Sequence, residues 1–154
     1  SVGGILEVVA TGFPAGIGNP NYDGIENRLA KTVFGIPAIK GVSFGSGFDG
    51  CVSTGSEQND PFTIHDGKIT TIQNNSGGIQ GGISNGMPII MQVGLKPTSS
   101  IFKPQQSISL SKQEITTLAI KGRHDPCIAI RAVPVIEAVT ALVLLDFLVE
   151  HQKL

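Results

Sequence analysis

The sequence is poor in charged residues, and this shortage excludes one large class of partner. Charged residues make up 15% of the 154 residues, and the net charge is −1. Proteins that bind nucleic acid carry a dense stripe of lysine and arginine that neutralises phosphates. The arginines of this chain form no such stripe, because they stand far apart at Arg28, Arg123 and Arg131. We therefore expect no nucleic-acid partner.

Cysteine and long apolar runs are also scarce. Cys51 and Cys127 lie far apart and in no metal-binding spacing, which favours reduced thiols in a cytoplasmic protein. We recognise no signal-peptide pattern. The most apolar run, Ala138–Val149, is shorter than a bilayer span and contains Asp146, so we expect a core helix and no membrane partner. Because Ser1 leads directly into a strand pattern, we expect a chain shortened by excision, cleavage or truncation.

Glycine, by contrast, is abundant. The 20 glycines are about twice the usual share of ~7%, and they cluster at Gly41–Gly50 and Gly77–Gly86. Apolar residues stand between them, which indicates tight turns or close approach of the backbone to a ligand. Gly45–Gly50 has the GxGxxG spacing of a dinucleotide-binding turn. The polar segment that follows lacks helical periodicity, so we interpret Gly45–Gly50 as a glycine-rich turn.

Hydrophobic periodicity and turn residues predict a single α+β domain over residues 1–154, with an antiparallel or mixed sheet packed against long helices. We expect a helix at Gly24–Phe34 with Asp23 as its N-cap, and one at Ala132–His151 with Pro134 in its first turn. The apolar face of the second helix is wide enough to be buried on more than one side. The expected strands are Gly3–Thr11, Ala38–Phe44, Phe62–Ile64, Lys68–Ile72, Pro88–Leu95 and Glu114–Ile120, and Phe102–Leu110 is expected to be a loop that leads to another strand.

Two loops carry groups that suit an anionic ligand. Lys96 is followed by Pro97, Thr98, Ser99 and Ser100, and a lysine with three hydroxyls can bind a phosphate. The same residues are also an ordinary exit from a strand into a turn. The glycines at Gly77–Gly86 can present backbone N–H groups to an anion or a flat ring, or can form a wide loop without a ligand.

The most charge-dense segment is the turn that begins at Lys121. Arg123, His124 and Asp125 stand side by side between Gly122 and a proline, so they belong to a turn. Arginine, histidine and aspartate can hold an anionic substrate and move a proton. The alternative is a loop ion pair, in which Asp125 serves Arg123 and His124 is solvated.

Taken in order, these segments resemble motifs of the chorismate synthase family. The matching segments are Ser1–Gly4, Gly77–Gly86, Leu95–Ser100, Gly122–Cys127 and Arg131–Glu137. The resemblance implies a lyase that converts 5-enolpyruvylshikimate 3-phosphate to chorismate and phosphate by 1,4-elimination. This is the last common step of aromatic amino acid biosynthesis, and the family needs reduced FMN although the reaction has no net redox change. The family also forms homotetramers.

The resemblance further implies roles for individual residues. Asp125 helps to move protons at the flavin ring, and Arg123 lies between flavin and substrate. Many members of the family have Asn where this chain has Pro37. His124 and Arg131 accompany the motif, and Arg131 is expected to pair with Glu137. The implied flavin-binding residues are Pro37, Ala38, Gly81, Lys96, Pro97, Thr98, Ser99, Ser100 and Arg123.

The likeness covers what looks like the C-terminal half of such an enzyme, and so half of its β-α-β sandwich. The family's N-terminal half, with a Glu-Ser-His-Gly motif, catalytic histidines and several substrate-binding arginines, is not in this sequence. His65 in a predicted hairpin and His151 at a helix end do not replace those histidines. Two functions remain open: part of a catalytic lyase, or an inactive half-domain that binds flavin and phosphate.

Overall fold

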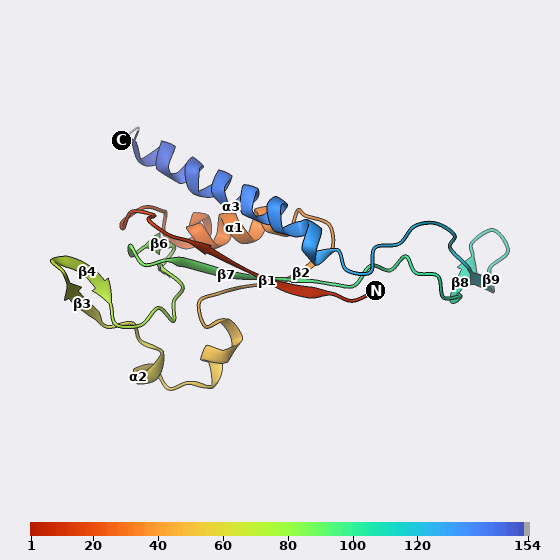
Figure 1. Ribbon diagram of the computed structural model, residues 1–154, viewed down its shortest axis with the longest axis horizontal. Helices are drawn as coiled ribbons and strands as arrows, with labels where there is room; N and C mark the ends of the chain where they lie inside the picture. Colours follow the sequence, from red (N-terminus) through yellow and green to blue (C-terminus); the bar gives the residue numbers. More distant parts are fainter. Residues whose placement is uncertain (153–154) are drawn as a thin grey trace.

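The centre of the molecule is a three-stranded antiparallel sheet (Figure 1). The computed structural model describes residues 1–152. Strand β7 (Ile89–Leu95) lies in the middle, between β1 (Gly4–Ala10) and β2 (Ile39–Phe44). Gly4 and Ile39 both pair with Leu95, from opposite sides. The starts of the two outer strands therefore meet the end of the middle strand.

Two helices cover one face of this sheet, which confirms the predicted α+β class (Figure 1). Helix α1 (Ile25–Val33) packs against β2, and α3 (Ala129–Gln152) packs against β1 and α1. The sheet is antiparallel throughout the described strands, so the mixed alternative does not apply.

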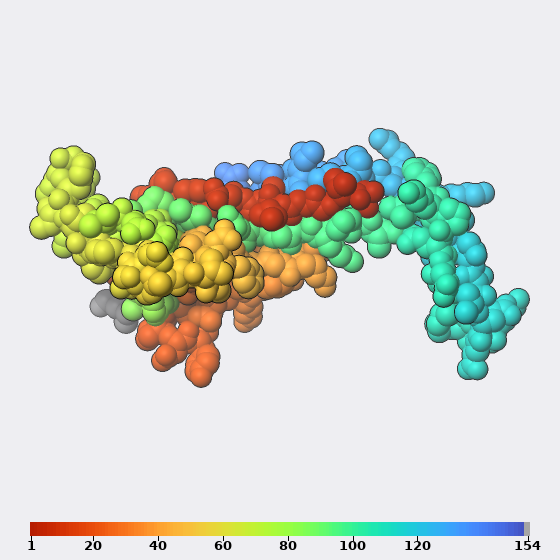
Figure 2. Space-filling model, turned by 90° about the horizontal axis from the view of Figure 1, so that it is seen from below, coloured from red at the N-terminus to blue at the C-terminus, as the bar shows by residue number. Residues whose placement is uncertain are grey.

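Shorter elements surround the sheet and its helices. Two hairpins project from opposite ends of the molecule, and β1 runs along the surface between them (Figure 2). The predicted hairpin after Pro61 is confirmed, and it forms the projection at one end. The shorter elements are η1 (Asn21–Asp23), η2 (Gly47–Val52), α2 (Gly55–Gln58), β3 (Phe62–His65), β4 (Lys68–Thr71), β5 (Ile79–Gln80), β6 (Ile83–Ser84), β8 (Gln105–Ser109) and β9 (Glu114–Leu118).

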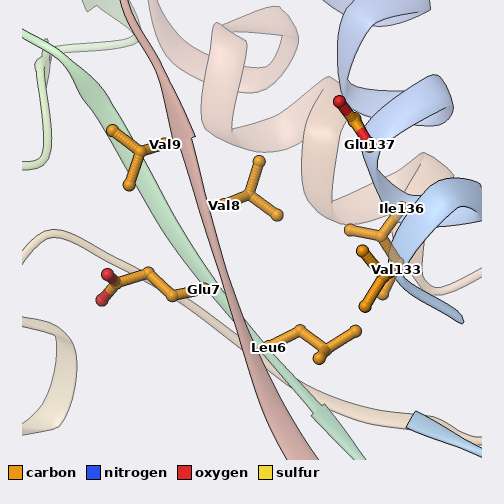
Figure 3. Close-up of a pocket in the computed structure, with 7 residues that line it drawn as sticks. All are labelled: Leu6, Glu7, Val8, Val9, Val133, Ile136 and Glu137. Carbon is orange, nitrogen blue, oxygen red and sulfur yellow. The ribbon is translucent and has the colours of Figure 1, made fainter. Parts of the chain in front are cut away.

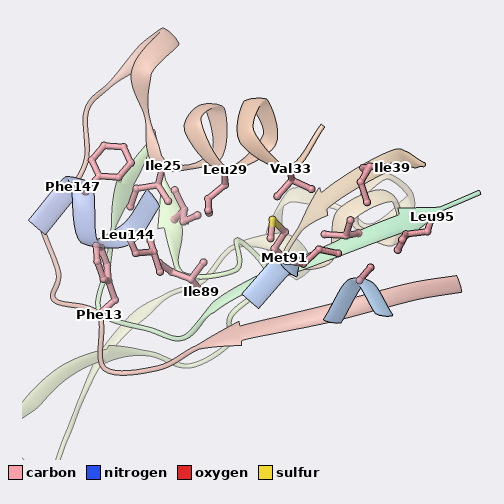
Figure 4. Packing of buried hydrophobic residues seen from close by; sticks show 14 of the residues in the cluster. Phe13, Ile25, Leu29, Val33, Ile39, Ile89, Met91, Leu95, Leu144 and Phe147 are labelled. Atoms are coloured by element: carbon pink, nitrogen blue, oxygen red, sulfur yellow. The ribbon is translucent and has the colours of Figure 1, made fainter. Parts of the chain in front are cut away.

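The core lies between the sheet and the helices (Figure 4). Ile25, Leu29 and Val33 recur every four residues on α1, and all three are fully buried, as expected for the apolar face of an amphipathic helix. Alternate residues of β7 point into the same layer, because side chains of a strand alternate between its two faces. The buried residues of β7 and α3 are Ile89, Met91, Val93, Leu95, Ala129, Ala132, Ile136, Thr140, Leu144 and Phe147.

Three local predictions are wrong. The N-cap of α1 is Gly24, and the side-chain oxygen of Asn27 accepts its N–H at 3.1 Å. Helix α3 begins before Ala132, so Pro134 lies beyond its first turn. The polar segment after Val52 does contain a short helix, α2, where the side chain of Glu57 accepts the N–H of Thr54 at 2.8 Å. This backbone hydrogen bond lowers the pKa of Glu57.

Helix α3 is longer than the sequence pattern suggested, and by length and composition it could cross a membrane. One of its faces packs on the sheet and α1. Its other face is exposed, with Ile130 at 75% and Leu142 at 64%. Within residues 1–152, helix α3 is therefore buried on one side. The contacts with the sheet favour a core helix.

A cluster of ion pairs joins α1 to the C-terminal part of α3. Nη1 of Arg28 lies 3.1 Å from Asp146 and 2.8 Å from Glu150, and the guanidinium also pairs with Asp23. It stacks on the ring of Phe147 at 4.3 Å. The hydrogen bond from Arg28 lowers the pKa of Asp23, and the hydrogen bonds to Asp23 and Glu150 raise the pKa of Arg28. Asp23, predicted as a helix cap, thus serves this cluster instead.

An apolar groove runs between β1 and α3 (Figure 3). Leu6 and Val8 point from the strand toward Val133 and Ile136 of the helix, and Glu137 lines the same groove. None of the predicted flavin or catalytic residues lies here. The groove follows the free edge of the sheet, because β7 is the sole described partner of β1.

Neighbouring leucines on α3 test this packing. Leu144 is 7% exposed and Leu145 is 55% exposed. We expect Leu144→Ala to lower the free energy of unfolding of the 154-residue chain by about 2–5 kcal/mol, because it removes buried surface and leaves a cavity. Leu145→Ala is expected to change it by about 0.5 kcal/mol or less. Urea unfolding followed by circular dichroism measures both values, and equal losses would contradict the assigned buried face.

Candidate active site

The predicted site residues gather mainly at the end of the sheet where Leu95 pairs with both outer strands. The Lys96–Ser100 loop continues from β7 at this end. Pro37 and Ala38 precede β2, and Ser1 begins the segment that leads into β1. A parallel bridge between Val2 and Cys127 brings the charged turn to the same place. Segments that are far apart in sequence therefore meet around one strand end.

Gly3 and Gly4 permit this close approach. A Cβ atom at Gly3 would lie 2.3 Å from the carbonyl oxygen of Leu95 and 3.2 Å from Cδ of Pro97. At Gly4 it would lie 2.7 Å from Cβ of Ala129, at the start of α3. Real side chains do not make contacts as short as 2.3 Å or 2.7 Å, so the paired glycines allow the loop after β7 and the start of α3 to pack against β1.

Ala38 lies in a strained turn that contacts the Lys96 loop. Its φ angle is 73°, in the left-handed region that costs a residue with a side chain about 1–2 kcal/mol. The carbonyl oxygen of Ala38 accepts the backbone N–H of Lys96 at 3.0 Å. Strained backbone of this kind is concentrated at functional sites. The structure thus joins two of the segments that the resemblance assigns to flavin binding.

The loop itself presents one cation and several hydroxyls. Lys96 and Ser99 are exposed, whereas Thr98 and Ser100 are partly buried. The hydroxyl of Ser1 donates to the carbonyl oxygen of Thr98 at 2.6 Å, which holds the middle of the loop. Oγ1 of Thr98 is buried and has no hydrogen-bond partner within residues 1–152.

The charged turn is held against β1 by its backbone. The N–H of Val2 donates to the carbonyl oxygen of Pro126 at 2.8 Å. Asp125 pairs with Arg131, with 3.2 Å between Oδ2 and Nε. The expected pairing of Arg131 with Glu137 is therefore wrong, and so is the alternative in which Asp125 serves Arg123. Arg123 is exposed and lines a cleft of about 490 Å³ with these residues.

His124 is partly buried, contrary to the alternative of a solvated side chain. Its Nδ1 lies 2.8 Å from Oγ of Ser100, and its ring meets the ring of Phe102 edge to face at 4.4 Å. Sequence reasoning assigned no contact to this histidine, because Ser100 and Phe102 lie more than twenty positions away.

Gly81 lies away from the other predicted residues. Gly81 and Gly82 form the turn between β5 and β6, with φ angles of 61° and 84°. Two successive positive φ angles are the requirement of a type I′ hairpin turn. The turn contacts the start of α1, since the N–H of Ile25 donates to the carbonyl oxygen of Gly82. This is the Ile89 end of β7, roughly 20 Å along the strand from Leu95 at 3.3 Å per residue.

Asp60 is a structural residue that the sequence analysis missed. It is 7% exposed, and its carboxylate accepts the backbone N–H groups of Asn75 and Ser76, each at 2.8 Å. These bonds hold the start of the glycine-rich segment. An aspartate before a proline gives no sign in sequence that it will bind backbone fifteen residues later.

Comparison with known proteins identifies the class of this fold and site. The family model described as chorismate synthase matches residues 1–149. This chain therefore belongs to the chorismate synthase family. A solved crystal structure of chorismate synthase superimposes with a TM-score of 0.77 and 33% identity, covering 97% of this chain and 38% of the other.

Curated relatives agree with this assignment. Chorismate synthase of Crocosphaera subtropica is 55% identical over 153 residues, and that of Opitutus terrae is 52% identical over 146 residues. The matches cover 99% and 95% of this chain, but 42% and 40% of the relatives. Archaeoglobus fulgidus chorismate synthase is 52% identical, with 41% of its length covered. The chain thus spans about two fifths of the length of these relatives.

Ala38 allows a test of strain at the candidate site. We expect Ala38→Gly to raise the free energy of unfolding by up to about 1 kcal/mol, because relief of left-handed strain outweighs the chain entropy that glycine adds, about 0.4–1 kcal/mol. Ala30→Gly, in the interior of α1, is the matched control and should lower it by about 1 kcal/mol. Thermal unfolding distinguishes the two signs. A loss at Ala38 equal to that at Ala30 would contradict the strained conformation.

Proposed function

We propose that this chain is the C-terminal part of a chorismate synthase and carries most of the flavin-binding residues of that enzyme. The whole protein converts 5-enolpyruvylshikimate 3-phosphate to chorismate and phosphate, with reduced FMN as cofactor. The observation that supports this most strongly is the convergence of Ala38, Lys96–Ser100 and Arg123–Asp125 at one end of the sheet. The reaction in this proposal is the one that the chorismate synthase family carries out.

The Lys96–Ser100 loop fits the phosphate group of FMN. Lys96 offers an exposed positive charge, and a buried hydroxyl without a partner, such as that of Thr98, costs about 1–3 kcal/mol. A phosphate oxygen would satisfy that hydroxyl. Arg123 and Arg131 line one cleft beside His124, and Lys103 lines another. Asp125 lines both, so three cations surround one carboxylate.

The roles of the charged turn follow from its position. Reduced FMN, when bound, supplies an electron-rich ring that favours departure of phosphate. Arg123 has no ion-pair partner within residues 1–152, so its guanidinium is free to stabilise negative charge on the leaving phosphate. Asp125 lies beside it, and its carboxylate is 35% exposed and oriented by Arg131. We assign Asp125 the movement of a proton between substrate and solvent.

This part of the chain accounts for only some of the binding groups that the reaction needs. The substrate carries a phosphate and carboxylates. Within residues 1–152, Arg28 belongs to the cluster at α1 and Arg131 pairs with Asp125. Arg123 is therefore the one arginine in the described residues that is left to bind these anionic groups. We propose that the remainder of the enzyme supplies further cations and covers the exposed face of α3. A homotetrameric, cytoplasmic enzyme remains our expectation from the family.

A full-length hybrid tests the activity. In it, residues 1–154 replace the matching segment of the Crocosphaera subtropica relative. We expect the folded hybrid to form chorismate from 5-enolpyruvylshikimate 3-phosphate with reduced FMN, detected by chorismate absorbance. The 154-residue chain alone should show no turnover, because it lacks the remaining substrate-binding groups. A folded but inert hybrid would contradict the proposed function.

Asp125→Asn in the same hybrid tests the proton-transfer role. We expect kcat to fall by about 100-fold or more, because an amide of the same shape cannot accept a proton, and general acid–base catalysis contributes about 10²–10⁴-fold. Arg131→Gln is the matched control. It removes the ion pair with Asp125 but keeps the carboxylate, and exposed pairs contribute only about 0–1 kcal/mol. If both variants lose kcat equally, Asp125 acts through the ion pair and not as a base.

A further inference from the structure

One hydrogen bond joins the Lys96–Ser100 loop to the charged turn. It runs between Oγ of Ser100 and Nδ1 of His124, at 2.8 Å. Within residues 1–152, this is the one hydrogen bond between the two segments. The loop carries the residues assigned to the cofactor phosphate, and the turn carries Arg123 and Asp125. This bond joins the two segments directly, whereas the hydrogen bonds of Ser1 with Thr98 and of Val2 with Pro126 join them through the N-terminal segment.

The ring of His124 is fixed by a second contact. Phe102 meets it edge to face, with 4.4 Å between ring centroids and an interplanar angle of 87°. Aromatic contacts of this geometry contribute about 0.5–1.5 kcal/mol beyond buried area. Phe102 follows Ser100 by two residues, so both contacts anchor the same loop. Together they set the direction of the second ring nitrogen, Nε2.

Nε2 of His124 is buried and has no hydrogen-bond partner within residues 1–152. Buried polar atoms are nearly always hydrogen-bonded, so this nitrogen is suited to a group that binds at the cleft. His124 lines the clefts on both sides of the turn, with Lys103 on one side and Arg123 on the other. Asp125 lines both clefts, but Lys103, Arg123 and Arg131 outnumber its one carboxylate. This balance favours an anionic ligand, whose oxygens accept hydrogen bonds.

The direction of the Ser100 bond follows from this. A neutral imidazole has one donor nitrogen and one acceptor nitrogen. If Nε2–H donates to an oxygen of the ligand, then Nδ1 is the acceptor. The hydroxyl of Ser100 can rotate to donate to Nδ1. One tautomer thus satisfies both the loop and the ligand.

We propose that His124 is a positioning residue. Its Nδ1 accepts a hydrogen bond from Ser100, which fixes the phosphate loop relative to Arg123 and Asp125. Its Nε2–H donates to a phosphate or carboxylate oxygen bound in the cleft. The identity of that ligand as FMN rests on the proposed function, whereas the Ser100–His124 bond and the tautomer do not.

The tautomer can be measured directly in the 154-residue chain. We expect ¹⁵N spectra of labelled histidine to show His124 protonated at Nε2 at a pH where the ring is neutral. Ser100→Ala should shift the Nδ1 resonance and leave Nε2 protonated, whereas Ser99→Ala, at an exposed neighbouring hydroxyl, should shift neither. Protonation at Nδ1, or an Nδ1 resonance unchanged by Ser100→Ala, would overturn the proposal.

The positioning role can be measured in the full-length hybrid by FMN fluorescence quenching. We expect Ser100→Ala to weaken FMN binding by about tenfold, or about 1.4 kcal/mol. His124→Asn places an amide near the position of Nδ1 and keeps a partner for Ser100. His124→Gln places its amide near Nε2 and loses that partner. Ser100→Ala should therefore still weaken binding in the Asn background and have almost no effect in the Gln background.

The outcomes separate this inference from the proposed function. An equal effect of Ser100→Ala in all backgrounds, or no effect in the unmutated hybrid, would overturn the positioning role. If the folded, unmutated hybrid binds no FMN, the proposed function fails instead. The same three backgrounds are then compared by the urea midpoint of the 154-residue chain, where the Ser100 effect must again vanish with His124→Gln.

Discussion

The contact between Gly3 and the end of β7 is the constraint on which the candidate site depends. No side chain fits between Gly3 and the carbonyl oxygen of Leu95. The backbone of the N-terminal segment can therefore lie directly against the residues that lead into the Lys96–Ser100 loop. The same segment holds the charged turn through Val2 and Pro126. A Cβ atom at Gly3 would push the N-terminal segment away from the end of β7 and the start of the Lys96–Ser100 loop.

The residues that stabilise the fold and the residues of the candidate site lie at different places along the sheet. The hydrophobic core and the Arg28 cluster lie over the middle of the sheet and the C-terminal part of α3. The cationic loop and turn lie beyond Leu95, at the opposite end of that helix. Charged groups of the site are thus kept out of the core, where they would be costly to bury. They remain close enough to the sheet to be held by backbone hydrogen bonds.

Much of this arrangement could be predicted from sequence, because it follows from local periodicity. The strands and α1 have clear patterns, and the paired double glycines mark turns with positive φ. The helix ends are less predictable: Asp23 pairs with Arg28, and Gly24 is the N-cap of α1. The pairing of Arg131 with Asp125 depends on the path of a turn, which no spacing rule specifies. For the same reason, the contact of His124 with Ser100 required the folded chain.

The prediction of the candidate site residues rests more on motif resemblance than on physical reasoning. Lys96 with its hydroxyls suggested a phosphate on chemical grounds, but Ala38 gave no such signal, and its left-handed conformation is visible only in the structure. Gly81 shows the opposite case. Its glycine character is explained by a type I′ turn, so the residue type alone does not require a ligand.

The middle strand of the sheet is also the last of the three in the sequence. During synthesis, β1 and β2 are both complete long before β7, and neither pairs with the other. Gly4 can pair with Leu95 only after β7 has been synthesised, and this end of the sheet forms only then. Contacts this distant in sequence slow folding. Insertion of β7 pairs both outer strands, so the step that joins the site segments also covers one edge of each strand.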